Sequence, residues 1–264
     1  MSTTFLQKVT AEARERVAQS REFGYFAKLQ KQAEQNREER EPHAFHAGLS
    51  RSDRTNIIAE IKRASPSKGV IRGEIDVAKL ARSYAAGGAA AISVLTETKH
   101  FDGSISDLVT ATRTIDIPVL RKDFIVDEYQ IVEAAASGAS AILLIVAALS
   151  VEELRGLHAT ATEFGLDVLV EIHDAAEMQT AIEIGATIIG VNNRDLHSLE
   201  VSLDTSRQLI EHRPEGVLMV SESGISTLDE INELKALGFN GFLIGETLMR
   251  SGNPSETLAS WTKI

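Results

Sequence analysis

The stretch Gly138-Ala-Ser-Ala-Ile-Leu-Leu-Ile-Val146 joins two features that recur along this chain of 264 residues. A glycine follows a segment with helical spacing, and an apolar residue of an aliphatic run stands four residues after it. Because glycine readily adopts the left-handed conformation that ends a helix, it marks the boundary between a helix and the next strand. The same arrangement occurs three more times, about every 50 residues as in a repeat architecture: at Gly88 with Ile92, Gly185 with Ile189 and Gly238 with Phe242.

Eight short runs rich in β-branched residues alternate with segments of helical spacing. The runs are residues 56–61, 90–95, 118–121, 140–146, 167–172, 188–191, 217–220 and 241–244. Each of the four glycines precedes an even-numbered run, so a βαβα unit is repeated and the strands should be parallel. An open doubly wound sheet usually has fewer strands and a glycine-rich turn after the first, and no G-x-G-x-x-G motif stands there. We therefore predict a (β/α)8 TIM barrel with an N-terminal helical extension.

Three helices have recognisable starts in the sequence. A Ser, Thr or Asp followed three residues later by Glu is typical of a capping box, in which each side chain binds the other residue's backbone N–H group. These starts fall between predicted strands, as the alternation in a barrel requires. They are Ser150 with Glu153, Asp174 with Glu177 and Thr227 with Glu230.

Residues 1 to about 50 lie outside the repeat and carry a helical pattern of their own. A charged run, residues 34–41, follows that pattern and is typical of a solvated face. One interpretation is a solvated helix and linker; the other is a helical extension packed across one barrel mouth. In both, residues 1–264 form one domain, with the barrel from about residue 56 to residue 264. The apolar stripe of the first helix comprises Phe5, Leu6, Val9, Ala13 and Val17.

The composition is that of an ordinary soluble globular protein, with 43% hydrophobic and 25% charged residues. The net charge of -11 argues against nucleic acid or an anionic membrane as the main partner. The absence of cysteine excludes disulfides and thiolate chemistry. The histidines form no H-x-x-x-H or H-E-x-x-H motif, so we expect no metal and no cofactor. The longest apolar run, residues 139–149, is too short for a bilayer and the first residues lack a signal-peptide core, so we expect a cytoplasmic protein.

Polar residues gather where the predicted strands end. In a (β/α)8 barrel these carboxyl-terminal ends and the loops after them carry the function, so this placement is more specific than any single residue. His173 also stands near one of these ends, but we expect it to have a helix-start or solvated role. The polar residues at the ends are Glu60, Lys62, Lys122, Glu171, Asn192, Arg194, Glu222 to Gly224, and Gly245 with Glu246.

Charged residues at these ends suggest proton transfer. Glu60 and Lys62 are two residues apart, so both side chains leave the strand on one face, and buried charge is costly unless it is paired or used. Lys122 should point inward, where Lys62 would lower its pKa by repulsion and make it a suitable general acid; the alternative is a surface lysine at a loop entrance. Glu171 lies among aliphatic residues and either pairs with a lysine or acts as a base.

The last two loops have the composition of phosphate-binding loops. Residues 221–226 (Ser-Glu-Ser-Gly-Ile-Ser) and 244–248 (Ile-Gly-Glu-Thr-Leu) supply small residues with free backbone N–H groups, which we expect at helix starts. The alternative is simple helix capping by Ser223 or Ser226. A further segment, Phe101-Asp-Gly-Ser104, is predicted to be either a mobile loop with an aromatic tip or an ordinary turn.

Several segments together closely resemble indole-3-glycerol phosphate synthase, over residues from about 57 to about 250. The N-terminal 50 residues resemble that family only in being a helical extension. The segments are residues 58–69 (Ile-Ala-Glu-Ile-Lys-Arg-Ala-Ser-Pro-Ser-Lys-Gly), 93–97 (Ser-Val-Leu-Thr-Glu) with 101–104, 119–125 (Val-Leu-Arg-Lys-Asp-Phe-Ile), 170–173 (Val-Glu-Ile-His), 190–196 (Gly-Val-Asn-Asn-Arg-Asp-Leu) and 221–225 (Ser-Glu-Ser-Gly-Ile).

The resemblance implies the step of tryptophan biosynthesis that closes the indole ring. The substrate would be 1-(2-carboxyphenylamino)-1-deoxyribulose 5-phosphate, and the products indole-3-glycerol phosphate, carbon dioxide and water. It implies that Lys122 is the general acid, that Lys62 lies near the substrate carboxylate and phosphate, and that Glu171 is a candidate base in dehydration. Glu60 and Asn192 would orient the reacting centre and stabilise its charged intermediate.

The resemblance also implies a set of binding residues. Arg194 and Ser65 would contact the substrate, and Phe124 would pack against its aromatic ring. The phosphate would be held by Ser223, Gly224, Gly245 and the N–H of Glu246; Ser223 is also placed among the catalytic residues, and Glu222 and Leu243 among the substrate-binding ones. The cluster that would steer the anionic substrate comprises Lys62, Arg63, Lys68, Lys122 and Arg194.

Two other functions remain as alternatives. A phosphoribosylanthranilate isomerase would share the phosphate loops but would need a different acid–base pair. A non-catalytic barrel would not need the charged residues at the mouth, all of which are present. For the enzyme we expect a phosphorylated small-molecule substrate and a monomer or weak homodimer.

Overall fold

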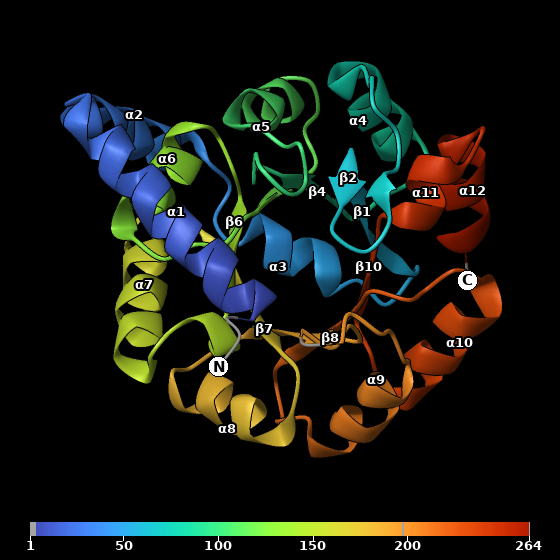
Figure 1. The fold of residues 1–264 in the computed structure, drawn as a ribbon. Helices are drawn as coiled ribbons and strands as arrows, with labels where there is room; N and C mark the ends of the chain where they lie inside the picture. Colours follow the sequence, from blue (N-terminus) through green and yellow to red (C-terminus); the bar gives the residue numbers. More distant parts are fainter. Residues whose placement is uncertain (1–3, 197, 264) are drawn as a thin grey trace.

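The computed structural model describes residues 4–196 and 198–263, and in them eight parallel strands close into a barrel (Figure 1). The strands are β1 (Asn56–Ile61), β4 (Ala91–Leu95), β5 (Val119–Lys122), β6 (Ala141–Ile145), β7 (Asp167–Ile172), β8 (Ile188–Asn192), β9 (Leu218–Glu222) and β10 (Gly241–Ile244). They are hydrogen-bonded around the barrel in chain order, and β10 closes against β1. A short antiparallel pair, β2 (Ala64–Ser65) and β3 (Gly69–Val70), follows β1 as a hairpin.

Helices surround the barrel (Figure 1). Before β1 come α1 (Phe5–Glu22), α2 (Phe26–Glu39) and α3 (Ala44–Leu49). The later helices are α4 (Val77–Ala86), α5 (Ile105–Thr112), α6 (Glu128–Ala136), η1 (Val146–Ala148), α7 (Val151–Glu163), α8 (Ala175–Glu183), α9 (Asp204–Leu209), η2 (Ile210–His212), α10 (Leu228–Leu237), α11 (Glu246–Arg250) and α12 (Pro254–Trp261). No helix within the described ranges is long and apolar enough to cross a bilayer. The alternation confirms the predicted (β/α)8 barrel with its N-terminal helical extension.

Each predicted run coincides with a barrel strand, and the ends differ by at most two residues. The largest difference is at β9, which the sequence predicts to stop at Val220 but which continues through Ser221 and Glu222. Both extra side chains are polar and buried, a combination that sequence patterns assign to a loop. Glu222 is therefore part of the sheet, opposite Asn192 of β8 and Leu243 of β10.

The four repeated glycines all adopt the left-handed conformation predicted for them. Their φ angles are +87° at Gly88, +84° at Gly138, +81° at Gly185 and +114° at Gly238. Each lies between the end of a helix and the strand after it, where a residue with a side chain would be strained. The repeat seen in the sequence is thus a repeat of backbone geometry.

Two of the three predicted capping boxes form, at Ser150 with Glu153 and at Thr227 with Glu230. The third is wrong. Asp174 does cap α8, but the Glu177 side chain binds the backbone N–H of His173 instead of that of Asp174. The reason is that the His173 ring lies within reach and adds a second contact to the same carboxylate oxygen.

The apolar core has two parts, one inside the barrel and one between the barrel and its helices. Ile58 and Leu120 belong to the inner part, together with Phe45 and Leu49 of α3. The backbone oxygen of Leu49 accepts a hydrogen bond from the side chain of Asn56, the first residue of β1. Helix α3 therefore closes the amino-terminal end of the barrel and leaves the other end open.

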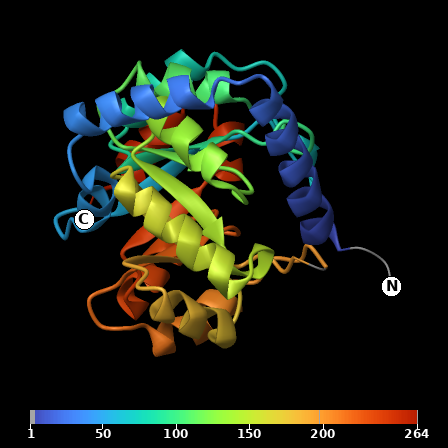
Figure 2. The ribbon, with the colours of Figure 1, turned by 90° about the vertical axis from the view of Figure 1, so that its left-hand side faces the viewer.

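The first helix, α1, lies across the opposite, carboxyl-terminal mouth (Figure 2). Arg16 binds Asp123 after β5, with 2.7 Å between Nη2 and Oδ1. Glu12 binds Lys99 and His100 after β4, at 2.6 and 2.7 Å. Of the two interpretations of the extension, the packed one is therefore correct. The predicted apolar stripe faces inward, with four of its members buried: Leu6, Val9, Ala13 and Val17.

Arg121 of β5 is a buried arginine that points away from the barrel interior, towards α6. Its guanidinium donates to the backbone oxygen of Gln130 at 2.6 Å and to the Thr96 hydroxyl at 3.1 Å. It also pairs with Asp123 at 3.2 Å and Glu133 at 2.9 Å. Buried charges are tolerated only when they are paired and hydrogen-bonded, as these are.

Replacing Arg121 with Met should lower the free energy of unfolding by about 3–5 kcal/mol, because the buried carboxylate of Asp123 loses a cationic partner. Urea denaturation followed by circular dichroism measures the change. Arg155, exposed on α7, supplies the control, and Arg155→Met should change stability by less than about 0.5 kcal/mol. A loss no larger than the control's would contradict this role for Arg121.

Candidate active site

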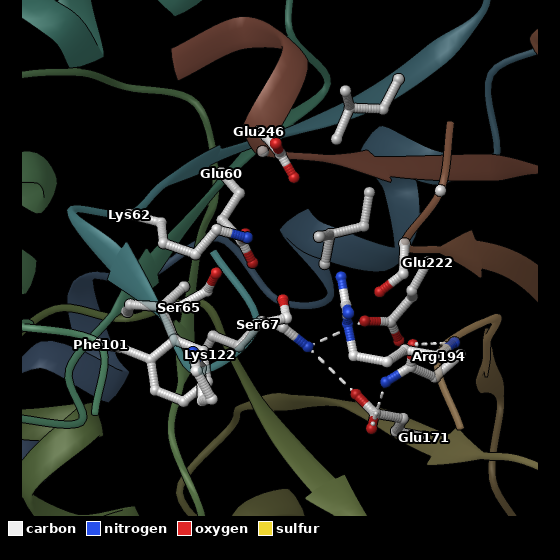
Figure 3. Close-up of a pocket in the computed structure, with 18 of the residues that line it drawn as sticks. Glu60, Lys62, Ser65, Ser67, Phe101, Lys122, Glu171, Arg194, Glu222 and Glu246 are labelled. Atoms are coloured by element: carbon white, nitrogen blue, oxygen red, sulfur yellow. Dashed lines mark hydrogen bonds and ion pairs between the residues drawn. The ribbon is translucent and has the colours of Figure 1, made fainter. Parts of the chain in front are cut away.

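A cavity of about 700 Å³ opens at the carboxyl-terminal ends of the strands, within the usual size of small-molecule sites (Figure 3). Every predicted catalytic and substrate-binding residue lines it. The barrel thus brings together side chains that are far apart in the chain. They are Glu60, Lys62, Ser65, Lys122, Phe124, Glu171, Asn192, Arg194, Glu222, Ser223, Gly224, Leu243, Gly245 and Glu246.

The ammonium group of Lys122 lies between two carboxylates. Its Nζ is 2.9 Å from Glu222 Oε2 and 3.1 Å from Glu171 Oε2 (Figure 3). Lys122 comes from β5, Glu171 from β7 and Glu222 from β9, and all three point into the barrel mouth. Their positions are set by strands rather than by flexible loops, which favours precise geometry.

The predicted influence of Lys62 on Lys122 is wrong. Burial alone would lower the pKa of Lys122, but the carboxylates of Glu171, Glu222 and Glu60 outweigh burial and raise it. Lys62 instead pairs with Glu60, with 2.5 Å between Nζ and Oε1, so its charge is largely balanced. The sequence places two cations at one mouth but does not show the carboxylates that separate them.

Glu171 was expected either to pair with a lysine or to act as a base, and both roles require an ionised carboxylate. In the structure it pairs with Lys122. Its other oxygen, Oε1, accepts a hydrogen bond from Asn192 Nδ2 at 2.9 Å. Burial alone would raise the pKa of Glu171, but Lys122, followed by His173 and Asn192, holds it well below its usual range. Glu171 is therefore an ionised carboxylate in a buried position.

The pKa of Glu222 is moved in the opposite direction from that of Glu171. Burial raises its pKa to about 7, and repulsion from Glu171 adds to this effect although Lys122 opposes it. One of its oxygens, Oε1, is buried and has no hydrogen-bond partner among the described residues. Two neighbouring carboxylates with pKa values moved in opposite directions are characteristic of acid–base sites.

Two glycines make room for the buried carboxylates. A Cβ atom at Gly190 of β8 would overlap Glu222 Oε1, and one at Gly245 would overlap Glu60 Oε1. Both φ angles are outside the left-handed region, so the reason for glycine is space and not backbone conformation. Gly190 was not among the predicted site residues, and the signal that could have identified it is a glycine inside an otherwise aliphatic strand, which often marks a close approach of another group.

The two predicted phosphate loops differ from each other. Gly245 directly precedes α11, as expected for a loop at a helix start. Ser223 and Gly224 instead form two consecutive left-handed residues, with φ of +63° and +84°, and α10 begins only at Leu228. The expectation of a helix start at Gly224 is therefore wrong, because these two left-handed residues form a turn before the helix. Successive backbone N–H groups in such a turn form a concave anion site.

Helix α10 is not capped by Ser223 or Ser226, the two residues considered for that role. The cap of α10 is Thr227, and the Ser226 hydroxyl binds Glu230. Ser223 makes neither contact, so simple capping does not explain it. The side chain of Glu246 pairs with Arg250 one helical turn later, at 3.1 Å, so its charge is balanced within α11.

The predicted steering cluster is smaller than expected. Lys62, Lys122 and Arg194 line the cavity, whereas Arg63 and Lys68 do not. Arg63 makes a two-point ion pair with Asp107, which holds its charge beside α5. The sequence could not separate these residues, because each follows a strand end.

Several lining residues were missed by the sequence patterns. The apolar residues Leu143 and Ile145 point inward from β6, and strand alternation could have identified them. Phe5 and Leu6 reach the cavity from α1, for which the sequence left two placements open. The remaining apolar wall includes Phe101, whose ring centroid is 6.2 Å from that of Phe124.

The loop that carries Phe101 is held by several hydrogen bonds. Its backbone oxygen accepts from the Ala64 N–H at 3.2 Å, and the Gly103 N–H donates to Glu97 at 2.8 Å. Glu97 also accepts N–H groups of His100 and Phe101. These contacts favour a fixed turn over the predicted mobile loop. In the part of the chain that the structure describes, no three His, Cys, Asp or Glu side chains are grouped to hold a metal ion.

Comparisons with known proteins identify the family of this chain. The family model for indole-3-glycerol phosphate synthase matches residues 6–260. The indole-3-glycerol phosphate synthase of Laribacter hongkongensis is 47% identical over 258 residues, covering 96% of this chain and 97% of the relative. That of Exiguobacterium sibiricum is 52% identical over 213 residues, covering 81% and 82%.

Solved structures support the fold alone, since their sequence identities are low. The 3-hexulose-6-phosphate synthase of Salmonella typhimurium has a TM-score of 0.62 at 13% identity, covering 78% of this chain and 96% of the other. KGPDC from Streptococcus mutans has a TM-score of 0.61 at 11% identity, covering 79% and 95%. From the family match and the curated relatives, the chain belongs to the indole-3-glycerol phosphate synthase family.

Proposed function

We propose that this chain closes the indole ring of 1-(2-carboxyphenylamino)-1-deoxyribulose 5-phosphate, releasing carbon dioxide and water, as a step of tryptophan biosynthesis. One observation supports the catalytic roles of individual residues: the Lys122 ammonium lies between the carboxylates of Glu171 and Glu222 in the cavity. A charged proton donor beside an ionised carboxylate suits a reaction that needs both an acid and a base.

Lys122 is the proposed general acid. It remains charged at neutral pH, so it can donate a proton to the sugar carbonyl oxygen as the aromatic carbon attacks the carbonyl carbon. The new carbon–carbon bond then allows the carboxylate to leave as carbon dioxide. In the dehydration that follows, the Lys62 ammonium, which lines the same cavity, donates a proton to the sugar hydroxyl, which leaves as water, and Glu171 accepts the proton from the neighbouring carbon. Glu60 and Asn192 orient the reacting centre.

The two sides of the cavity suit the two ends of the substrate. Phe124, Phe101 and Leu143 offer an apolar wall for the aromatic ring. The backbone at Ser223, Gly224 and Gly245 offers N–H groups for the phosphate. Lys62 and Arg194 supply positive charge near the mouth, and Ser65 lies on the hairpin beside it.

The rival assignment, phosphoribosylanthranilate isomerase, has less support because Lys62 and Lys122 both line this cavity. The single-domain organisation, the cytoplasmic location and the monomeric or weakly dimeric state remain predictions. A phosphorylated small-molecule substrate fits the family.

The direct test is to supply the purified chain with the anilino-deoxyribulose phosphate and to follow indole fluorescence. A steady increase, proportional to the concentration of enzyme, is the expected result. No increase at any pH between about 6 and 9, where a general acid and base of this kind should work, would reject the proposed function.

Replacing Lys122 with Met should lower kcat at least about a hundredfold, because the reaction loses its general acid. Indole fluorescence measures kcat, and circular dichroism checks that the variant is folded. Lys79, exposed on α4, supplies the matched control, and Lys79→Met should retain wild-type kcat. Comparable activity of the two variants would remove Lys122 from this role.

Gly190→Ala should lower kcat/KM about a hundredfold, because its Cβ would displace the Glu222 carboxylate and with it the Lys122 ammonium. Gly156 in α7 is a suitable control, since no atom lies within 4 Å of a Cβ placed there. Gly156→Ala should keep full activity and stabilise the helix by up to about 1 kcal/mol. An active Gly190→Ala variant would show that the position of Glu222 is not critical.

A further inference from the structure

His173 stands directly after β7, two residues beyond Glu171, and it is not one of the residues that line the cavity. Strand alternation places the two side chains on the same side of the chain. The imidazole is mostly buried, because its side chain is only 15% exposed, and it stands directly before the Asp174 cap of α8. A histidine buried behind a candidate base needs a partner for each ring nitrogen.

Glu177 fixes one side of the ring. Its Oε2 accepts the His173 backbone N–H at 2.7 Å and lies 3.1 Å from ring Nδ1. Glu177 is in the first turn of α8, where its own N–H binds Asp174 at 2.8 Å. The carboxylate that holds the histidine is therefore anchored to a helix.

The other side of the ring faces Glu171. His173 Nε2 is buried, makes no hydrogen bond within the described structure, and lies 3.5 Å from Glu171 Oε1. Asn192 binds the same Oε1 oxygen, while Lys122 binds Oε2. The two oxygens of Glu171 thus have different surroundings.

We propose that His173, fixed by Glu177, is a positioning residue that holds Glu171 through Oε1 and leaves Oε2 as the oxygen that exchanges protons. This inference rests on the proposed function, in which Glu171 is the base. His173 touches neither the cavity nor the substrate, so its effect is exerted through Glu171. Its cation also helps to keep that carboxylate ionised.

The charges around the pair agree with this role. The charged groups facing Glu171 are Lys122 from β5, Glu222 from β9 and His173 itself; those facing His173 are Glu171 and Glu177. Burial alone would lower the pKa of His173, but the nearby carboxylates of Glu171 and Glu177 raise it to about 10. Since this pKa is above the ordinary 6.5, the ring stays protonated through neutral pH and loses its proton only as the pH rises through about 10.

A nuclear magnetic resonance titration of the ring nitrogens tests the charge without reference to activity. The expected result for His173 in the wild-type chain is an imidazolium at pH 8, and in Glu177→Gln a ring that titrates at lower pH. A neutral ring at pH 7 in the wild-type chain would overturn the inference even if the enzyme is active. Absence of indole product from the wild-type chain is a separate outcome, which rejects the proposed function.

Kinetics test the positioning itself. His173→Asn should lower kcat about tenfold and change KM less than twofold, because the cavity wall is unaltered. In a Glu171→Gln background the same substitution should have no further effect, since the two residues act as a unit. Additive losses in that double-mutant cycle would mean a merely structural role and would overturn the proposal.

Two further variants complete the set. Glu177→Gln keeps the shape of the side chain and should lower kcat in the same direction as His173→Asn. Asp174→Asn removes a neighbouring carboxylate but can still cap α8, so it should keep wild-type kcat. Thermal unfolding of each variant separates loss of folding from loss of positioning. Equal kcat in Glu177→Gln and Asp174→Asn would contradict the role given to Glu177.

Discussion

The ion cluster of Lys122 with Glu171 and Glu222 is the constraint on which the rest of the site depends. Charges in a buried position are stable only when each has a partner at short distance. Here the partners come from three different strands, so the closed barrel must hold them in register. The neighbouring pair of Glu60 and Lys62 adds a second balanced unit beside the first. Most charges in the cavity therefore have a partner, although Glu222 Oε1 has no hydrogen-bond partner among the described residues.

Space inside the barrel is the second constraint. The buried carboxylates of Glu222 and Glu60 fit at one end because glycine stands where a side chain would collide with them, at Gly190 of β8 and at Gly245 directly after β10. At the other end, Phe45 and Leu49 fill the interior and exclude water. One end of the barrel is thus packed for stability and the other is kept open for chemistry, with α1 covering part of it.

The sequence predicted the architecture well and the interactions of the site only in part. The alternation of runs and the left-handed glycines are local features, so they could be recognised without knowledge of contacts. The inward direction of Lys122 followed from strand alternation in the same way. Its partners did not, because Glu171 and Glu222 are 49 and 100 residues away and their distances depend on the register of the closed sheet. The role of α1 was also undecided, since its docking depends on ion pairs such as that of Arg16 with Asp123.

The four left-handed glycines stand at the amino-terminal ends of the even-numbered barrel strands, on the face opposite the cavity. The backbone turns that build the barrel are consequently separated from the side chains that carry out the chemistry by the full length of the strands. Substitutions in the loops at the mouth can therefore alter substrate preference while the turns at the other face are kept. The protein thus has an architecture in which new activities can evolve without a new fold.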